Sequence, residues 1–129
     1  MTEKQKELLL RDLCGRLPYG VKIESVFINP DTKEHKSCGI EVFNATSLLM
    51  IRDGLGEFKP YLFPLSSMTE EQKKEYDQLI ELELEAIDDE IDSTQVTAFE
   101  VDFYNKHHFD WRGLIEKGLA IDATNLNVY

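Results

Sequence analysis

The feature that most constrains the fold is the stretch at residues 59–76, which reads K-P-Y-L-F-P-L-S-S-M-T-E-E-Q-K-K-E-Y. Pro60 and Pro64 have no backbone N–H for a strand ladder, so they mark the end of a region of strands. The hydroxyl residues after them stand three positions before a glutamate or glutamine, which is the spacing of a helix capping box. Two pairs fit this spacing: Ser67 with Glu70, and Thr69 with Gln72. A change from sheet to helix is therefore predicted here.

Upstream of this boundary, residues 2–16 have the pattern of an amphipathic helix. Leucines recur at helical spacing, at Leu9, Leu10, Leu13 and Leu17. Thr2 is placed to cap the first turn, and Gly15, Pro18 and Gly20 predict the end of the helix.

Between this helix and the boundary, four short segments have the character of strands. They lie at residues 21–28, 36–43, 48–52 and 57–62. The first two alternate apolar and polar residues, whereas the third is largely apolar and is predicted to lie inside the sheet. Asp53-Gly54 is a hairpin signal between the last two segments, and Pro60 restricts the fourth to an edge or a bulge. Short connections favour an antiparallel meander.

Downstream of the boundary the pattern is helical. One helix is predicted to run to about residues 88–91, and a second, capped by Ser93 or Thr94, covers about 95–108. The apolar stripe of the first helix is Tyr76, Leu79, Ile80, Leu84, Ile87 and Ile91. Asp110 is placed to cap a short turn over 111–118, and the tail at 119–129 is expected to be extended.

These elements predict a single α+β domain over residues 1–129. It would consist of an N-terminal helix, a three- to four-stranded antiparallel meander, then two helices and a short C-terminal turn packed on one sheet face. Each amphipathic element needs an apolar surface to cover, and the sheet offers one.

Composition narrows the classes of partner. The 129 residues carry a net charge of −11, which argues against direct nucleic-acid binding and against an anionic membrane surface. The charged N-terminus lacks a signal-peptide core, and no apolar run approaches the roughly 20 residues of a membrane span, so a cytoplasmic location is expected. Cys14 and Cys38 form no C-x-x-C pair and are predicted to be free, buried thiols.

Three blocks of the sequence resemble a group of small proteins encoded by anaerobic gut bacteria and by their phages and mobile elements. The blocks are R-L-P-Y-G-V-K, K-P-Y-L-F-P-L-S-S-M-T-E-E and H-H-F-D-W-R-G-L-I-E-K-G-L-A. The resemblance implies a phage or mobile-element context, and no activity is assigned to the group. The position of Phe63 is often basic there, so this chain departs from the group at the junction of sheet and helix.

The sequence favours neither a metal site nor catalysis. His107 and His108 are adjacent, so on a helix they point about 100° apart and do not readily share a metal with Asp110. His35 stands in a predicted turn. No nucleophile elbow, phosphate loop or metalloprotease motif is present, so no catalytic residue and no cofactor are predicted.

The acidic stretch at residues 70–92 is the leading candidate for a functional surface. It holds 11 Asp and Glu against two Lys, a net of −9, whereas the remaining residues hold 14 acids and 12 bases, a net of −2. Such a face suits a basic protein partner, although a charge run is often only a solvated surface. The candidate carboxylates are Glu81, Glu85, Asp88 and Asp89.

Aromatic residues supply further candidates. Tyr61, Phe63, His108 and Trp111 are placed near the sheet–helix junction, and Tyr and Trp are favoured in interfaces. With Tyr104 and Phe109 they also suit the packing of the last helix on the sheet. The predicted function is a non-enzymatic interaction protein. The alternatives are a small enzyme or ligand-binding domain with a pocket near His108 and Trp111, and an assembly component.

Overall fold

A computed structural model describes residues 2–86 and 93–129, and the side chains of these residues other than 83–97. The first helix, α1, spans Glu3–Arg16. Thr2 caps it as predicted, because the Thr2 hydroxyl accepts from the Gln5 N–H and the Gln5 side chain accepts from the Thr2 N–H. Both bonds satisfy donors that have no partner inside the helix.

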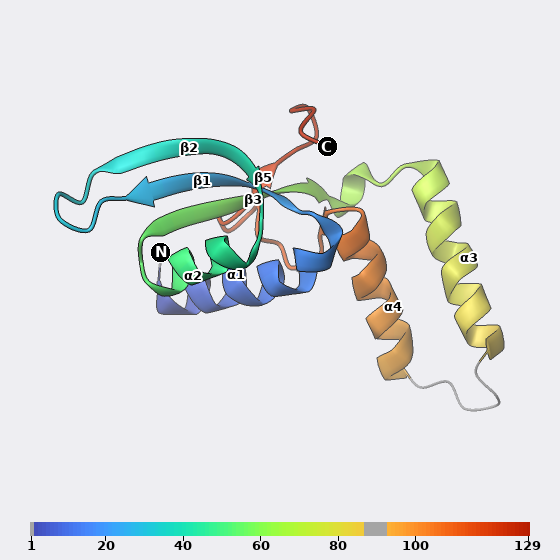
Figure 1. Ribbon diagram of the computed structural model, residues 1–129. Coiled ribbons are helices and arrows are strands. Elements are labelled where there is room, and N and C mark those ends of the chain that lie inside the picture. Colours follow the sequence, from blue (N-terminus) through green and yellow to red (C-terminus); the bar gives the residue numbers. More distant parts are fainter. Residues whose placement is uncertain (1, 87–92) are drawn as a thin grey trace.

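Residues 2–86 and 93–129 form a mixed sheet of five strands. Three longer strands are antiparallel: β1 (Lys22–Ile28), β2 (His35–Val42) and β3 (Gly56–Pro64). Two short strands, β4 (Phe109–Asp110) and β5 (Ile121–Asp122), pair with β3 in parallel. The α+β class and the leading N-terminal helix are therefore confirmed (Figure 1).

The segment predicted as a third strand, 48–52, is helical. Helix α2 spans Ala45–Arg52, and the Asn44 side chain accepts from the Ser47 N–H at 3.1 Å to cap it. Ser47 and Ile51, one turn apart, are buried, while Leu49 between them is 48% exposed. The prediction was wrong because a short, uniformly apolar run has no period that separates helix from strand.

Asp53 and Gly54 end α2 instead of turning a hairpin. The Gly54 N–H donates to the Ile51 carbonyl and the Leu55 N–H to the Met50 carbonyl, which is the Schellman pattern of a helix end. Gly54 has a φ of +72°, in the left-handed region that glycine adopts without steric cost. The same freedom serves both a hairpin turn and a helix end, so the dipeptide alone did not distinguish them.

The strand order also differs from a meander. β1 lies between β2 and β3, because α2 carries the chain from β2 back to the far side of β1. Pro60 stands opposite Ile23 in the last pair of the β1–β3 ladder, and β3 continues past it to meet β4 and β5. Among the described residues, Gly56–Pro60 pair only with β1, so β3 is one edge of the antiparallel part and the expectation of an edge strand at Pro60 is confirmed there.

Helix α3 spans Glu70–Ala86 and helix α4 spans Ser93–Lys106. Of the two predicted capping boxes the one formed is Thr69 with Gln72. The predicted end of the first of these helices at 88–91 lies outside the described residues. The second begins at Ser93, slightly earlier than predicted.

The two C-terminal helices do not cover the sheet as predicted. Figure 1 shows α1 and α2 beneath the three long strands, and α3 and α4 beside them. α4 contacts α1 and β4, and α3 packs chiefly on α4. The apolar face of the sheet is already occupied by α1, so the second helix pair packs on the end of this layer.

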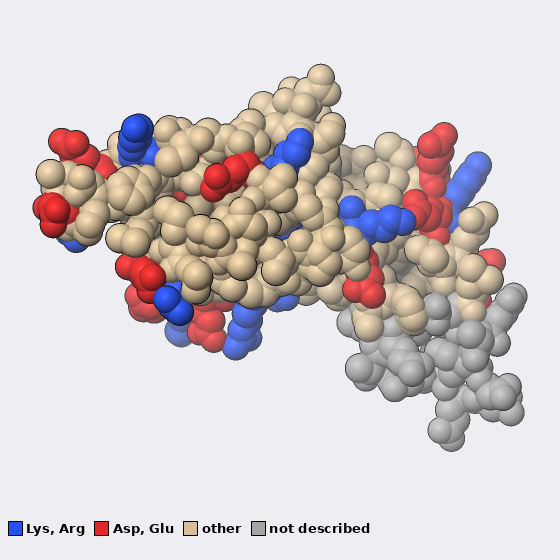
Figure 2. All heavy atoms as spheres, viewed as in Figure 1, with Lys and Arg blue, Asp and Glu red and all other residues tan. Residues whose placement is uncertain are grey.

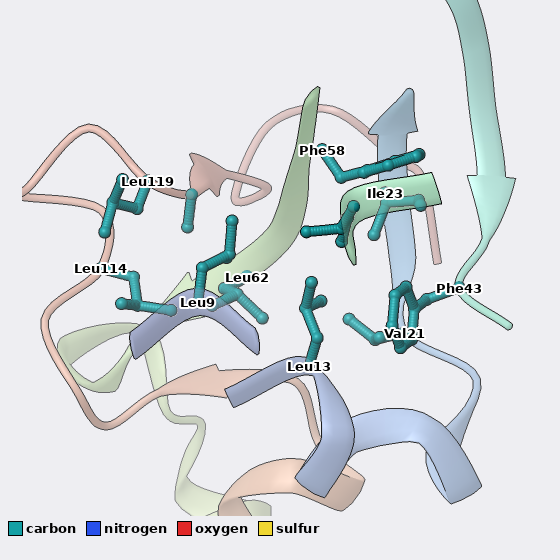
Figure 3. Close-up of a cluster of buried hydrophobic side chains, with 11 residues drawn as sticks. Leu9, Leu13, Val21, Ile23, Phe43, Phe58, Leu62, Leu114 and Leu119 are labelled. Atoms are coloured by element: carbon teal, nitrogen blue, oxygen red, sulfur yellow. The ribbon is translucent and has the colours of Figure 1, made fainter. Parts of the chain in front are cut away.

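The hydrophobic core lies between α1 and the sheet. Leu9 and Leu13 of α1 point toward β1 and β3, as Figure 3 shows. Their partners include Val21, Ile23, Phe43, Phe58, Leu62, Leu114 and Leu119. The apolar stripe predicted for α1 was partly wrong, because Leu17 is 39% exposed and the buried face instead includes Asp12 and Arg16.

Both cysteines are free and exposed, which corrects the prediction that the thiols are buried. Cys38 lies on β2, whose residues are all exposed, and Cys14 lies on the outer side of α1. No helix among the described residues combines the length and apolar character needed to cross a bilayer.

Loss of the α2 cap is expected to destabilise the protein. Asn44→Ala removes the acceptor for the Ser47 N–H and should lower the unfolding free energy by about 1 kcal/mol. Asn44→Asp keeps an acceptor and should cost much less. Urea denaturation followed by circular dichroism measures both. Equal stability of Asn44→Ala and the parent chain would contradict the helical assignment of this segment.

Candidate functional site

A buried ion pair stands where α1 meets the C-terminal part of the chain. Arg16 Nε lies 2.7 Å from Asp12 Oδ2 and Arg16 Nη2 lies 3.2 Å from Asp12 Oδ1. Arg16 Nη2 also donates to the carbonyl of Phe109 in β4, at 2.7 Å. Both charged side chains are fully buried, so each depends on the other for the solvation that water no longer supplies.

A second arginine reaches the same carboxylate. Arg112 Nε lies 3.3 Å from Asp12 Oδ1, although without the alignment of a hydrogen bond, and its guanidinium stacks 4.1 Å from the centre of the Trp111 ring. Asp12 is therefore shared by two cations. Arg16 Nη1 has no partner among the described residues. This cluster is engaged in holding segments together, and it presents no free carboxylate for acid–base chemistry.

Trp111 belongs to the same junction. Its ring N–H donates to Asn105 Oδ1 of α4 at 3.0 Å, and the Asn105 amide donates in turn to the Gly15 carbonyl of α1 at 3.3 Å. Gly15 admits this approach because an added Cβ would lie 3.3 Å from the amide nitrogen. The aromatic residues were predicted to pack the last helix on the sheet: Phe109 of β4 does so, with its ring centroid 6.3 Å from that of Phe103 in α4, whereas Trp111 connects α4 to α1.

His108 lies just beyond α4, with a φ of +61°. Its ring stacks on Tyr129 with centroids 3.9 Å apart, and its Nδ1 is buried with no partner among the described residues. Burial, reinforced by the nearby charge of Arg16, lowers the pKa of His108 from 6.5 to about 4. The imidazole is therefore neutral at pH 7, which suits stacking rather than ion pairing.

Tyr129 ties the tail to the sheet beside His108. Its hydroxyl accepts from the Lys22 N–H and donates to the Tyr61 carbonyl, each at 2.8 Å. Lys22 Nζ donates to the Val128 carbonyl and lies 5.6 Å from the Tyr129 ring centre. Phe63 lies 5.8 Å from the same ring. Tyr61 is 7% exposed, so most of its side chain is closed to a partner.

The two adjacent histidines and Asp110 each have a separate partner. His107 Nε2 lies 3.2 Å from Glu75 on α3, His108 stacks on Tyr129, and the Asp110 carboxylate accepts from the Leu114 and Ile115 N–H groups. Asp110 thus caps the turn that follows it, as predicted. Within residues 2–86 and 93–129 no three His, Cys, Asp or Glu side chains are grouped to hold a metal ion.

The acidic candidates lie on or beyond α3. Glu81 is exposed, and Glu85 lies in the last turn of the helix. Asp88 and Asp89 lie outside the described residues. None of residues 70–82 is buried, and two leucines remain open to solvent, Leu79 at 38% and Leu82 at 60%. Figure 2 shows red carboxylates standing out from the α3 end of the molecule, with a few blue side chains beside them.

Contacts between α3 and α4 fix the orientation of that face. Glu75 lies 3.2 Å from Lys106 Nζ and 3.2 Å from His107 Nε2. The Tyr76 ring meets Phe103 edge-on, with centroids 5.4 Å apart, and lies nearly parallel to Tyr104. These contacts hold one side of α3, whereas Asp77, Glu81 and Leu82 are exposed to solvent.

Three hollows lined by described residues bear on the predicted ligand site. One of about 200 Å³ has an apolar floor of Leu9, Ile51 and Phe58, and one of about 270 Å³ lies between Lys59 and Lys117. A third, of about 300 Å³, lies between α3 and α4 and is lined by Met68, Lys73, Tyr76, Asp77 and Tyr104. Neither His108 nor Trp111 lines any of them, so these hollows do not support the predicted ligand pocket near those residues.

Sequence reasoning did not identify the Asp12–Arg16–Arg112 cluster. A signal was present, because Asp12 and Arg16 are four residues apart on the same side of α1 as Leu9 and Leu13. Charges placed on an apolar stripe with ion-pair spacing indicate a buried pair. The participation of Arg112 is visible only in three dimensions.

No family model, no curated protein and no solved structure matches this chain. Function is therefore inferred from the geometry and charge of the chain.

Removing the buried carboxylate is expected to be strongly destabilising. Asp12→Ala leaves Arg16 buried without a counterion and should lower the unfolding free energy by about 3–5 kcal/mol. Glu7→Ala is a matched control, because Glu7 and Arg11 form an exposed pair with the same spacing on the same helix, and its cost should be below about 1 kcal/mol. Urea denaturation compares them. If the two variants lose similar amounts of unfolding free energy, the buried pair contributes no more to stability than the exposed one.

The stability of the protein should depend on pH through His108. Since its folded pKa of about 4 lies below the ordinary 6.5, the unfolded chain binds a proton between these pH values that the folded chain does not. The part of the unfolding free energy that comes from this difference is fully present above about pH 6.5 and is lost as the pH falls toward 4. His108→Asn tolerates the left-handed backbone and should reduce the slope of stability against pH in this window.

His35→Asn is the control, since His35 is exposed on β2. Denaturation series between pH 4 and 7 report the slopes. If His108→Asn and the parent chain have the same slope, His108 does not make the proposed contribution.

Proposed function

We propose that this chain is a non-enzymatic interaction protein of phage or mobile-element origin that binds a basic partner in the cytoplasm through the outer face of α3. The observation that carries the proposal is the exposure of α3. None of its residues 70–82 is buried, and Leu79 and Leu82 stand open beside carboxylates. A helix that packs on one neighbour and keeps apolar side chains in water has the character of a docking surface.

The charge distribution indicates the kind of partner. Residues 70–92 hold −9 of the net −11, so the rest of the molecule is close to neutral. A field concentrated in this way attracts cationic surfaces and raises association rates at low ionic strength. Like charges crowded on one helix also cost some stability, which a basic partner would relieve.

The proposed origin rests on a resemblance in the sequence. Its three distinctive blocks resemble small proteins of phages and mobile elements in anaerobic gut bacteria. Proteins that bind host DNA carry the basic surfaces that would complement the α3 face. A host DNA-binding protein is therefore the class of partner we infer.

Neutralising the acidic face should weaken this binding. The variant with Glu81→Gln, Glu85→Gln, Asp88→Asn and Asp89→Asn should bind purified basic DNA-binding proteins of the host about tenfold or more weakly than the parent chain. Binding by the parent chain should also fall between about 50 mM and about 300 mM salt, because screening shortens the reach of surface charges. Calorimetric titration measures both effects.

A second variant distinguishes an effect of the α3 face from an effect of the net charge of the protein. Glu3, Asp31, Glu34 and Glu116 are exposed and lie away from α3, so changing them to their amides alters the net charge by the same amount. This control should keep most of the affinity. If both variants lose affinity equally, or if no basic protein binds, the α3 face is not the binding surface.

A further inference from the structure

The hollow between α3 and α4 has a composition that suits a cation. It measures about 300 Å³ and is lined by Met68, Lys73, Tyr76, Asp77 and Tyr104. This volume is at the low end of the roughly 300–1,000 Å³ of ligand pockets, so it suits a single long side chain better than a large molecule. Two aromatic rings and a carboxylate are the groups with which proteins recognise organic cations.

The two tyrosines both pack on the ring of Phe103. Their rings are nearly parallel, with an interplanar angle of 11° and centroids 6.2 Å apart. Tyr76 packs edge-on against Phe103, which is buried. The ring centroid of Tyr104 lies 6.0 Å from that of the same phenylalanine. Burial raises the pKa of the Tyr76 phenol, and the neighbouring carboxylate of Glu100 raises it further. Both phenols therefore stay neutral, and both tyrosine side chains are partly exposed.

The charges around the hollow favour a cation. Asp77 lines it, Glu100 lies beside both tyrosines, and Glu81 follows Asp77 one turn along the exposed side of α3. Lys73 is the opposing charge, and its Nζ lies 3.5 Å from Glu70 on the preceding turn. Asp77 and Lys73 thus line the hollow with opposite charges, and Glu100 and Glu81 add negative charge near it.

We infer that this hollow receives an arginine side chain of the basic partner, with its guanidinium stacked on a tyrosine ring and its N–H groups directed to Asp77. This inference rests on the proposed function, since the hollow opens on the same helix, and it names the group that anchors the partner. Arginine is favoured over lysine because a planar guanidinium stacks on aromatic faces and offers several donors to a carboxylate.

The inference is tested with nona-arginine and nona-lysine peptides, titrated calorimetrically against the full chain at about 100 mM salt. The parent chain should bind nona-arginine about two- to fivefold more tightly than nona-lysine. Tyr104→Leu should abolish this preference while Tyr104→Phe keeps it, because only the second variant retains an aromatic face. Tyr19→Leu, in the turn after α1, is the control and should keep the preference.

Charge variants give an independent readout. Asp77→Asn should weaken nona-arginine binding severalfold, and Lys73→Gln should strengthen it, since the two residues line the same hollow with opposite charges. Circular dichroism of each variant confirms that the helices are retained. Tyr104→Phe keeps the test valid if Tyr104→Leu does not fold, because loss of the preference in a folded Tyr104→Phe chain would overturn the inference.

The outcomes distinguish the two proposals. Suppose that nona-arginine and nona-lysine bind with the same affinity, both to the parent chain and to Tyr104→Leu, while the variant neutralised at 81, 85, 88 and 89 loses binding. The acidic face is then the binding surface, and the inferred arginine site is overturned. If neither peptide binds the parent chain, the proposed function fails together with it.

Discussion

The buried pair of Asp12 and Arg16 is the interaction on which the arrangement of this molecule depends. Two charges withdrawn from water are tolerated only when every nearby partner is in place, because the desolvation of each is offset by the others. Arg16 also donates a hydrogen bond to the carbonyl of Phe109, 93 residues away, and Asp12 also forms an ion pair with Arg112. The first helix is thereby tied to the last third of the chain.

This junction explains how the candidate surface is presented. α4 is held at its C-terminal end by Asn105 and Trp111, which connect it to α1. α3 packs chiefly on α4, and none of its residues 70–82 is buried. Carboxylates can accumulate on such a helix at little cost to the core, and the hollow lined by Tyr76 and Tyr104 forms where the two helices diverge from the sheet.

The sequence predicted local features well and long-range ones poorly. The Thr2 cap, the Thr69 capping box and the Asp110 cap were all visible in advance, because each joins residues a few positions apart. Helix α2 was missed because its apolar run was uniform, although Asn44 before it and Gly54 after it are suitable helix-terminating residues. At the candidate site, exposed Glu81 agreed with a surface role, whereas Tyr61 and Trp111 have internal partners that no spacing indicated.

By itself, the sequence determined the α+β class, the positions of most helix and strand boundaries, and the concentration of negative charge at residues 70–92. These properties follow from composition, capping chemistry and periodicity, which act over a few residues. Only the tertiary structure decided that α2 returns the chain to the other side of β1, that the Asp12–Arg16 pair is buried, and that Met68, Tyr76, Asp77 and Tyr104 border one hollow. Each of these depends on the packing of segments far apart in the chain. The boundary at residues 59–76 shows both kinds of information. Its prolines and its helix cap are local features of the sequence, whereas the strands that pair with β3 lie far away in the chain.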